Sequence, residues 1–477
     1  MSQTENERIT LIRGLGLLAA ASIVVGNVVG TGVFLKARVM TCNVGKPSWV
    51  IFTWIFAGIL SLAGALTYAE LAAMMPRAGG EYVFIREAYG RACGFLFGWM
   101  QIFIAKTGSQ ASVAVAFAIF LNNLRGDTLK KVLFSFTLFG TQFTIDRLQL
   151  IAVAIIVFLT LLNCATVVIS GYVATALTFV KIALILGVGL GAFFLAQGNW
   201  SNLSLTDSGG ACYGVDNAVH YGAAGYTFVA GFGAAMLGAL WGYDGWDNIT
   251  FVAGEIKNPQ RNIPLALIGG TALIILMYVF VNIAYFYVLT PTQIANVAKE
   301  SSVAREVVSS FFGPAAVSLM AVGLMASSIG TLHTSILAGS RIPYAMAQDG
   351  LFFDKLAKVS ERTHVPVGAV LAQGAFASVL ALSGSFDTLT DYVIFGSWIF
   401  YGLATASVFI FRKKMPNAER PYRAWGYPIV PILFLFVTAF LLINTILTAT
   451  KQALIGLGLI ALGLPVYFYL SRRNTLS

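Results

Sequence analysis

Charged side chains are scarce in this sequence. Asp, Glu, Lys and Arg make up 10% of its 477 residues, whereas they account for about 25% of a typical soluble domain. Hydrophobic residues make up 58% of the chain, and the mean hydropathy is +0.80. This composition excludes a soluble globular protein and predicts a polytopic membrane protein.

Histidine and cysteine are rare as well, with three and four residues respectively. None of them has the spacing of a metal-binding motif, and the three distant histidines suggest no hydrolytic triad. The phosphate-binding motif GxxxxGK(S/T) is missing too, which counts against a pump driven by ATP. We therefore expect no metal, no cofactor and no enzymatic activity.

Apolar stretches of roughly 20 residues dominate the chain, and each is long enough to cross the hydrocarbon core of a bilayer. They predict an all-α membrane protein, a single transmembrane domain over residues 1–477 with twelve transmembrane helices. The helices are expected near residues 14–39, 48–75, 92–122, 148–168, 171–196, 228–254, 264–290, 314–340, 366–383, 390–410, 430–449 and 452–470.

Lys and Arg gather in the loops on the side that also holds the N-terminus, and the positive-inside rule assigns this side to the cytoplasm. Residues 197–227, on the opposite side, contain neither Lys nor Arg. We therefore expect a multi-pass protein of the plasma (inner) membrane with both termini in the cytoplasm. The net charge of +10 then reflects topology and contact with anionic membrane lipid, and nucleic acid is not an expected partner.

Two consecutive units of five helices are expected, over residues 14–196 and 228–410. Because five is odd, the two units sit in the membrane in opposite orientations, which is the five-plus-five inverted repeat of many secondary transporters. Helices 11 and 12, over residues 430–470, lie outside the repeat.

The first helix of each unit contains a break near its middle. Residues 26–32 (GNVVGTG) interrupt helix 1, and residues 241–248 (WGYDGWDN) interrupt helix 6. Unpaired backbone at membrane depth is tolerated only where it lines a cavity or binds a ligand. Close helix packing also favours glycine, but it does not require Asp244 and Asp247, whose insertion costs about 2.5–3.5 kcal/mol each. The two discontinuous helices therefore predict a transporter's binding site.

The two breaks offer complementary groups. The half-helix that begins at Gly32 presents free N–H groups and its positive dipole end, Gly30 leaves room, and Thr31 adds a hydroxyl, so this side suits a carboxylate. Unpaired carbonyls, which suit an ammonium group, are offered near Val28 and at the end of the other half-helix, which comprises Trp241, Gly242, Tyr243 and Asp244. Together the two sides match the head group of an α-amino acid.

Three side chains beside the second break have expected roles. Trp241 and Trp246 are predicted gating residues that cover the substrate amine, and the filling of apolar space is the alternative. Asp247 is expected to cap the second half of helix 6 rather than to contact the substrate.

Lys181 lies in helix 5, too far from either end to reach the membrane surface easily. A buried ammonium group needs acceptors, and we expect these to be exposed carbonyls around residues 22–26, including that of Gly26, and hydroxyls such as those of Ser327 or Ser328. Lys181 then fills the place of a sodium ion; a lysine that snorkels along its stem is the alternative. For Lys106 in helix 3 the sequence assigns no role.

Several segments, in order along nearly the whole chain, resemble the amino acid-polyamine-organocation superfamily and, within it, the L-type amino acid transporter family. They are residues 25–34 (VGNVVGTGVF), 68–71 (YAEL), 76–82 (PRAGGEY), 241–246 (WGYDGW), 255–259 (EIKNP) with 262–264 (NIP), and 420–428 (RPYRAWGYP).

The resemblance implies a core bundle of helices 1, 2, 6 and 7. It also implies that Thr31 and Gly32 donate to the substrate carboxylate, and that the carbonyls of Val28, Trp241 and Asp244 accept from the substrate amine. The family has a gating aromatic residue in helix 6 and a lysine in helix 5 that replaces a sodium ion. The resemblance implies that Trp241 and Lys181 match these two positions.

Animal members of this family are linked to a single-span glycoprotein through a cysteine in the loop between helices 3 and 4. Residues 123–147 contain no cysteine, so no covalent heavy subunit is expected. Cys42 and Cys212 are the two cysteines on the predicted outer side, and whether they pair is left open, as is the oligomeric state.

The sequence thus predicts a secondary transporter of neutral L-amino acids that works by alternating access and sodium-independent obligatory exchange. A proton- or sodium-coupled uptake permease for amino acids or polyamines remains an alternative, and a membrane-bound amino acid sensor is a second one. Side-chain specificity is left open, because the pocket walls come from helices 3, 8 and 10.

Overall fold

The computed structural model describes residues 10–126, 128–138, 141–206, 212, 219–298, 301–383, 386–448 and 450–475. The α-helices in chain order are α1 (Leu17–Val28), α2 (Gly32–Val44), α3 (Pro47–Met74), α4 (Glu81–Tyr89), α5 (Arg91–Met100), α6 (Lys106–Leu124), α7 (Arg147–Asn163), α8 (Val167–Phe194), α9 (Phe228–Tyr243), α10 (Pro259–Val288), α11 (Pro291–Ala295), α12 (Val303–Phe312), α13 (Ala315–Gly339), α14 (Arg341–Gln348), α15 (Val367–Ser383), α16 (Phe386–Lys414), α17 (Ile429–Thr448), α18 (Thr450–Ala461) and α19 (Gly463–Thr475). Three short 3₁₀ segments, η2 (Trp200–Ser204), η3 (Trp246–Glu255) and η4 (Asp354–Ala357), and one π-helical turn, η1 (Gln101–Ala105), complete the helical elements.

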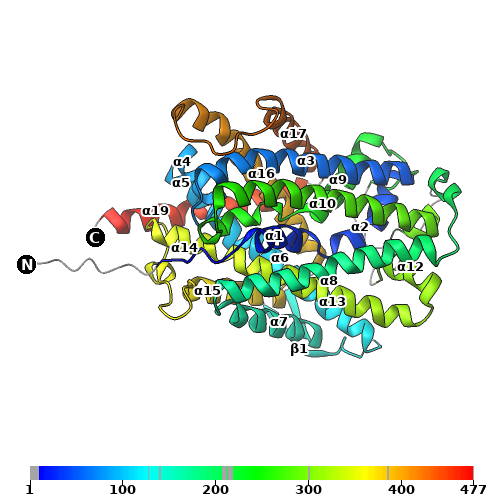
Figure 1. Ribbon diagram of the computed structural model, residues 1–477. Coiled ribbons are helices and arrows are strands. Elements are labelled where there is room, and N and C mark those ends of the chain that lie inside the picture. Colours follow the sequence, from blue (N-terminus) through cyan, green and yellow to red (C-terminus); the bar gives the residue numbers. More distant parts are fainter. Residues whose placement is uncertain are drawn as a thin grey trace, which may run out of the picture.

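The long helices run side by side in one elongated bundle (Figure 1). Helices α4, α5, α14 and α19 lie at one end of the bundle, and α2 and α12 lie toward the other. In the described part of the chain, nine helical stretches are long and apolar enough to cross a membrane, and α7 and α15 are apolar but shorter. The chain is therefore a multi-pass helical membrane protein.

Two short strands interrupt the helical fold, which the prediction of an all-α protein did not include. Strand β1 (Val132–Leu138) pairs antiparallel with β2 (Thr141–Asp146) between α6 and α7. Their sequences alternate polar with apolar or β-branched residues, a pattern typical of a strand pair with one exposed face. Asp146 ends β2 and caps α7, because its side chain accepts from the N–H of Gln149 at 2.8 Å.

Both broken helices are interrupted within the predicted segments. Helix α1 ends at Val28 and α2 begins at Gly32, so that three residues separate the two halves. Helix α9 ends at Tyr243, and η3 begins at Trp246 after Gly245, whose φ of +98° suits glycine alone. The backbone therefore leaves its helical path twice inside the bundle.

The broken helices are joined at the end of the bundle where α14 lies. The backbone N–H of Leu15 donates to Glu255, and the N–H of Lys257 donates back to Leu15, at 3.0 and 2.8 Å. The guanidinium of Arg341 makes two hydrogen bonds with the carboxylate of Glu255, at 2.7 and 2.9 Å, and both side chains are fully buried. These contacts close this end of the two broken helices against α14.

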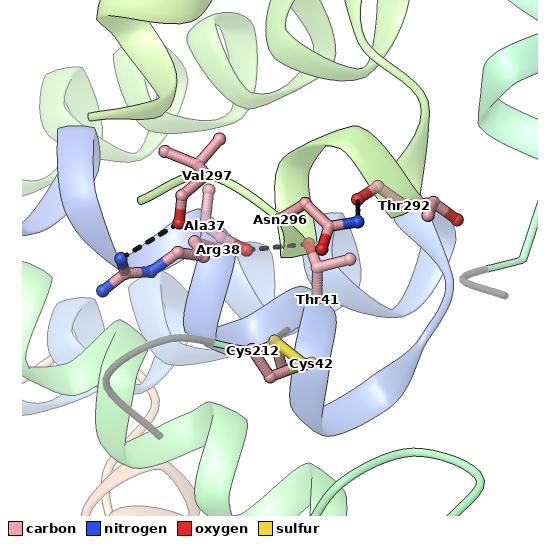
Figure 2. Close-up of a disulfide and its surroundings, with 8 residues drawn as sticks. All are labelled: Ala37, Arg38, Thr41, Cys42, Cys212, Thr292, Asn296 and Val297. Carbon is pink, nitrogen blue, oxygen red and sulfur yellow. Dashed lines mark hydrogen bonds between the residues drawn. A yellow bond between two sulfur atoms is a disulfide. The ribbon is translucent and has the colours of Figure 1, made fainter. Parts of the chain in front are cut away.

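A disulfide connects Cys42 of α2 with Cys212, which lies 170 residues further along the chain (Figure 2). The pairing that the sequence left open is therefore present. Arg38 of the same helix donates to the carbonyl of Val297 at 3.3 Å, and the N–H of Tyr221 donates to the carbonyl of Cys42 at 2.8 Å. These contacts fix α2 to the connections that precede α9 and follow α11.

The disulfide predicts how many thiols react. When cells are denatured and labelled with a mass-tagged maleimide, two cysteines should react, Cys93 and Cys164, because only these are free. Treatment of intact cells with a membrane-impermeant reductant should raise the number of tags to four, since Cys42 and Cys212 are expected on the outer side. A Cys42→Ser variant should carry three tags in both cases. Four tags without any reductant would contradict the pairing.

Candidate functional site

The two helix breaks touch one another. A Cβ atom added to Gly32 would lie 2.8 Å from Cα of Gly242 and 3.5 Å from the ring of Trp241. A Cβ atom added to Gly245 would lie 3.2 Å from the side chain of Asn27. The start of α2 and the end of α9 therefore meet with no side chain between them, and the break regions of both helices form one site.

The first turn of α2 presents donors to this site. Thr31 is 2% exposed, its hydroxyl bonds to none of the described residues, and its carbonyl accepts from Phe34 and Leu35 as α2 begins. The first N–H groups of an α-helix have no partner within the helix, and they carry the positive end of its dipole. Gly30 and Gly32 beside Thr31 leave this backbone uncovered, so the turn can bind a carboxylate.

The carbonyl of Val28 already has two donors. The N–H of Gly30 donates to it at 2.8 Å, and so does the hydroxyl of Tyr278 at 2.9 Å. The hydroxyl of Tyr278 also lies 2.9 Å from the carbonyl of Gly242. One tyrosine of α10 therefore bridges the two breaks. The sequence interpretation treated these carbonyls as unpaired and did not include Tyr278.

A signal for Tyr278 is present in the sequence, because a tyrosine in the middle of a mostly apolar span is expected to find a hydrogen-bond partner for its hydroxyl. Nothing within α10 specifies that the partners are the two breaks. Tyr243, which was predicted at the site, instead points its hydroxyl at the carbonyl of Trp54 in α3, at 3.1 Å.

The two aspartates beside the second break share one donor. The hydroxyl of Tyr401 in α16 lies 2.8 Å from Oδ1 of Asp244 and 3.1 Å from Oδ1 of Asp247. The predicted capping role of Asp247 is wrong, because Gly245 occupies the N-cap position of η3 and no side chain caps it. Asp247 still lies in the first turn, where a carboxylate is favoured by the helix dipole.

The two tryptophans occupy different environments. Trp241 is half-buried beside Gly32. Trp246 is 2% exposed, and its ring packs against those of Tyr68 and Tyr401, with centroid distances of 4.8 and 5.7 Å. Trp241 therefore lies against the start of α2, and Trp246 belongs to a buried aromatic cluster with Tyr68 and Tyr401.

Lys181 of α8 is 1% exposed and reaches the end of α1. Its ammonium donates to the carbonyl of Gly26 at 2.5 Å, as expected, and to the hydroxyl of Thr331 at 2.6 Å. The expected acceptors Ser327 and Ser328 are not used: their hydroxyls donate to the carbonyls of Val29 and Leu324, at 3.4 and 2.9 Å respectively. Thr331 lies on the same face of α13, one turn after Ser327. The sequence therefore predicted the correct helix but not the residue that accepts the hydrogen bond.

Lys106, for which the sequence assigned no role, follows directly after the π-helical turn η1. Its ammonium donates to Oδ1 of Asn248 and lies 5.1 Å from the ring centroid of Phe251. Both partners belong to η3, so Lys106 binds the second half of the broken helix from α6.

The bridge made by Tyr278 gives a testable prediction. A Tyr278→Phe substitution should lower the expected transport rate about tenfold, because it removes the donor of the buried Gly242 carbonyl, and leaving a buried carbonyl unsatisfied costs about 1–3 kcal/mol. The matched control is Tyr285→Phe in the same helix. That hydroxyl is buried without a hydrogen-bond partner in the described structure, so its removal should leave the rate unchanged. Equal rates for the two variants would show that the bridge has no role in transport.

The family and its relatives provide an independent comparison. A family model described as amino acid permease matches residues 15–464. The serine/threonine exchanger SteT of Bacillus subtilis is 30% identical over 97% of this chain and 98% of its own. The b(0,+)-type amino acid transporter 1 of Mus musculus is 28% identical, covering 93% and 85% of the two chains, and the large neutral amino acids transporter small subunit 2 of Mus musculus is 28% identical, covering 96% and 81%. These relatives are transporters, not enzymes, and they confirm the resemblance found in the sequence.

Proposed function

The chain belongs to the amino acid permease family, and we propose that it exchanges neutral L-amino acids across the plasma membrane by alternating access, without sodium. The observation that carries the proposal is the meeting of the two helix breaks, with donors on one side and carbonyls on the other. Relatives named as exchangers and amino acid transporters support the same activity.

The substrate head group is placed between the breaks. Thr31 and Gly32 donate to its carboxylate from the first turn of α2. Its amine is bound by the carbonyls of Trp241 and Asp244, at the end of the other half-helix. The carbonyl of Val28 accepts a hydrogen bond from the hydroxyl of Tyr278 in this structure. It therefore binds the substrate amine only in a state in which this hydrogen bond is broken. Trp241 closes over the bound substrate.

Lys181 supports the independence from sodium. A Na⁺ ion at a helix break is coordinated by exposed carbonyls and half-helix ends. Here the ammonium group of Lys181 lies between the carbonyl of Gly26 and the hydroxyl of Thr331, which are ligands of that type. A fixed cation at this place removes the need for a dissociable one. Exchange follows if the empty carrier returns slowly, so that one amino acid leaves for each that enters.

The fold that we propose has twelve spans in two inverted repeats, over residues 14–196 and 228–410, with helices 11 and 12 following. Helices are present in each of the twelve predicted ranges, and the broken helix stands first in each repeat. We propose that both termini lie in the cytoplasm, which the distribution of Lys and Arg supports.

No covalent heavy subunit is proposed. The connection between α6 and α7 contains no cysteine, and Cys42 and Cys212 are bonded to one another. The remaining two are half-buried; Cys93 lies in α5, and Cys164 lies in the turn between α7 and α8.

The test is uptake of labelled alanine, leucine and arginine into proteoliposomes that are either empty or preloaded with unlabelled amino acid. The proposal expects uptake of the neutral amino acids into preloaded vesicles alone, at equal rates with and without sodium. Strong uptake into empty vesicles, driven by a sodium or proton gradient, would contradict it and would favour a coupled permease. Binding with no uptake in either case would indicate a sensor.

A further inference from the structure

A buried group of charged residues lies behind the substrate site, and the proposed exchange does not use it. Glu81 is the first residue of α4, which lies between the candidate spans Pro47–Met74 and Arg91–Leu124. Its side chain is 0% exposed. The preceding Gly80 packs against the backbone of η3, where an added Cβ atom would lie 2.6 Å from the carbonyl carbon of Thr250. The loop before α4 thereby places Glu81 beneath the broken helix.

Among the described residues, three of the four carboxyl oxygens of Glu81 and Asp247 lack a hydrogen-bond donor, and the fourth, Oδ1 of Asp247, accepts from Tyr401. Both oxygens of Glu81 and Oδ2 of Asp247 are buried without a partner in the described structure. The two carboxyls nevertheless lie close enough to interact with one another. Buried polar atoms are nearly always paired, and an isolated buried carboxylate is far more costly than a neutral acid. Two adjacent acids with three unpaired oxygens therefore require an explanation.

The charged and titratable groups around Glu81 come from several elements. Those that interact with it are Asp247 of η3, Lys106 of α6, Tyr68 of α3 and Tyr401 of α16. The other charged side chains of this region, Arg91 and Asp349, face Tyr82 and Arg86 on α4. The carboxyl of Asp244, which shares the hydroxyl of Tyr401 with Asp247, faces Lys106 and Asp247 as well. One ammonium thus faces three carboxyls, so the group carries an excess negative charge if all three acids are ionised.

Physical chemistry favours one neutral acid here. Burial raises the pKa of Glu81 well above its usual range, and the neighbouring Asp247 carboxylate raises it further, while the Lys106 ammonium acts in the opposite direction. Two carboxyls that share a site commonly hold one proton between them for this reason.

We propose that Glu81 and Asp247 form a proton-binding site that holds one shared proton in this structure. The proton sits on Glu81, whose O–H donates to the unpaired Oδ2 of Asp247, so that one bond gives a partner to two of the three unpaired oxygens. It is taken from water at the end of the bundle where α4 lies and returns there, so it need not cross the membrane. The site makes the closing of the bundle, at the end where α4 and α14 lie, depend on pH.

The sign of the pH dependence follows from the raised pKa. At a pH below the usual pKa of a glutamate carboxyl, Glu81 contributes in full to the stability of this packed state. The contribution is lost as the pH rises from the usual pKa through the raised pKa of Glu81, because a further buried negative charge then forms.

The direct test is infrared difference spectroscopy of the purified full-length protein, titrated from acid to alkaline pH without substrate. The C=O stretch of a protonated carboxylic acid should persist at neutral pH and disappear in the Glu81→Gln variant. Glu87→Gln is the matched control, because Glu87 lies on the same helix with a 44% exposed side chain, and this variant should keep the band. The melting temperature of the wild type should fall as the pH rises, and that of Glu81→Gln should not follow it.

Asp247→Asn provides a second variant if Glu81→Gln fails to fold, since a change of hydrogen-bond partner should shift the frequency of the same band. A wild-type spectrum without protonated carboxyl at neutral pH would overturn the proposal. A band that is unaffected by either substitution would overturn it as well. The measurement requires no transport, so a failed exchange assay would leave this proposal standing and would count against the proposed function alone.

Discussion

Replacement of Lys181 by methionine should lower the rate of exchange at least about 100-fold. Methionine keeps an unbranched side chain in α8 but removes the two hydrogen bonds that the ammonium donates to Gly26 and Thr331. Hydrogen bonds to charged groups are worth about 1.5–3 kcal/mol each, and about 1.4 kcal/mol corresponds to a factor of ten in rate. The end of α1 then loses the cation that fixes it.

The effect is measured as the initial rate of exchange in proteoliposomes with equal amounts of protein that elute as one symmetric peak. Thr331→Val is the graded control: it removes one acceptor of Lys181 and keeps the charge, so it should cost about tenfold. If Lys181→Met exchanged within a few-fold of the wild type, the ammonium would have no role at the break. Activity that returns on addition of sodium would instead support the idea that Lys181 stands in for this ion.

The Gly32→Ala substitution should abolish exchange, with a loss of at least about 100-fold. The new methyl group would lie 2.8 Å from Cα of Gly242, and Gly242 has no space to retreat, because a Cβ atom on it would itself lie 2.6 Å from the ring of Trp54. Overpacking of a tight core costs about 1–3 kcal/mol, and here the methyl group also covers the N–H groups that are proposed to bind the carboxylate.

The matched control is Gly187→Ala in α8, where an added Cβ atom meets nothing within 4 Å. It should retain the wild-type rate within about twofold and stabilise the helix slightly. Both variants are compared by substrate-induced thermal stabilisation as well as by exchange. A Gly32→Ala protein that still binds and exchanges the substrate would exclude this turn as the carboxylate site.

The sequence predicted the helix breaks and the reach of Lys181 because both follow from local chemistry. Glycines within an apolar run, and aspartates at membrane depth, identify a break whatever the rest of the fold does. A lysine in the middle of a span must find acceptors, and the end of the broken helix offers them. The carbonyl of Gly26 was predicted on these grounds, and the structure contains that contact.

The residues that were missed depend on how distant helices pack together. Tyr278 and Tyr401 contribute their hydroxyls to the breaks from α10 and α16, and the pattern within those helices does not indicate their partners. Glu81 belongs to a turn-rich segment that has the composition of an exposed loop, and it is buried only because this segment folds beneath η3. Side-chain contacts of this kind are decided by the tertiary fold.

Exchange at the meeting point of the two breaks can be measured in a double-label experiment. Vesicles filled with ³H-labelled neutral amino acid are diluted into ¹⁴C-labelled amino acid without sodium, and entry and exit are counted in the same sample. We expect one molecule to leave for each molecule that enters, and almost no exit when the outer solution lacks substrate. Exit that continues into a substrate-free solution, or entry that exceeds exit, would contradict it.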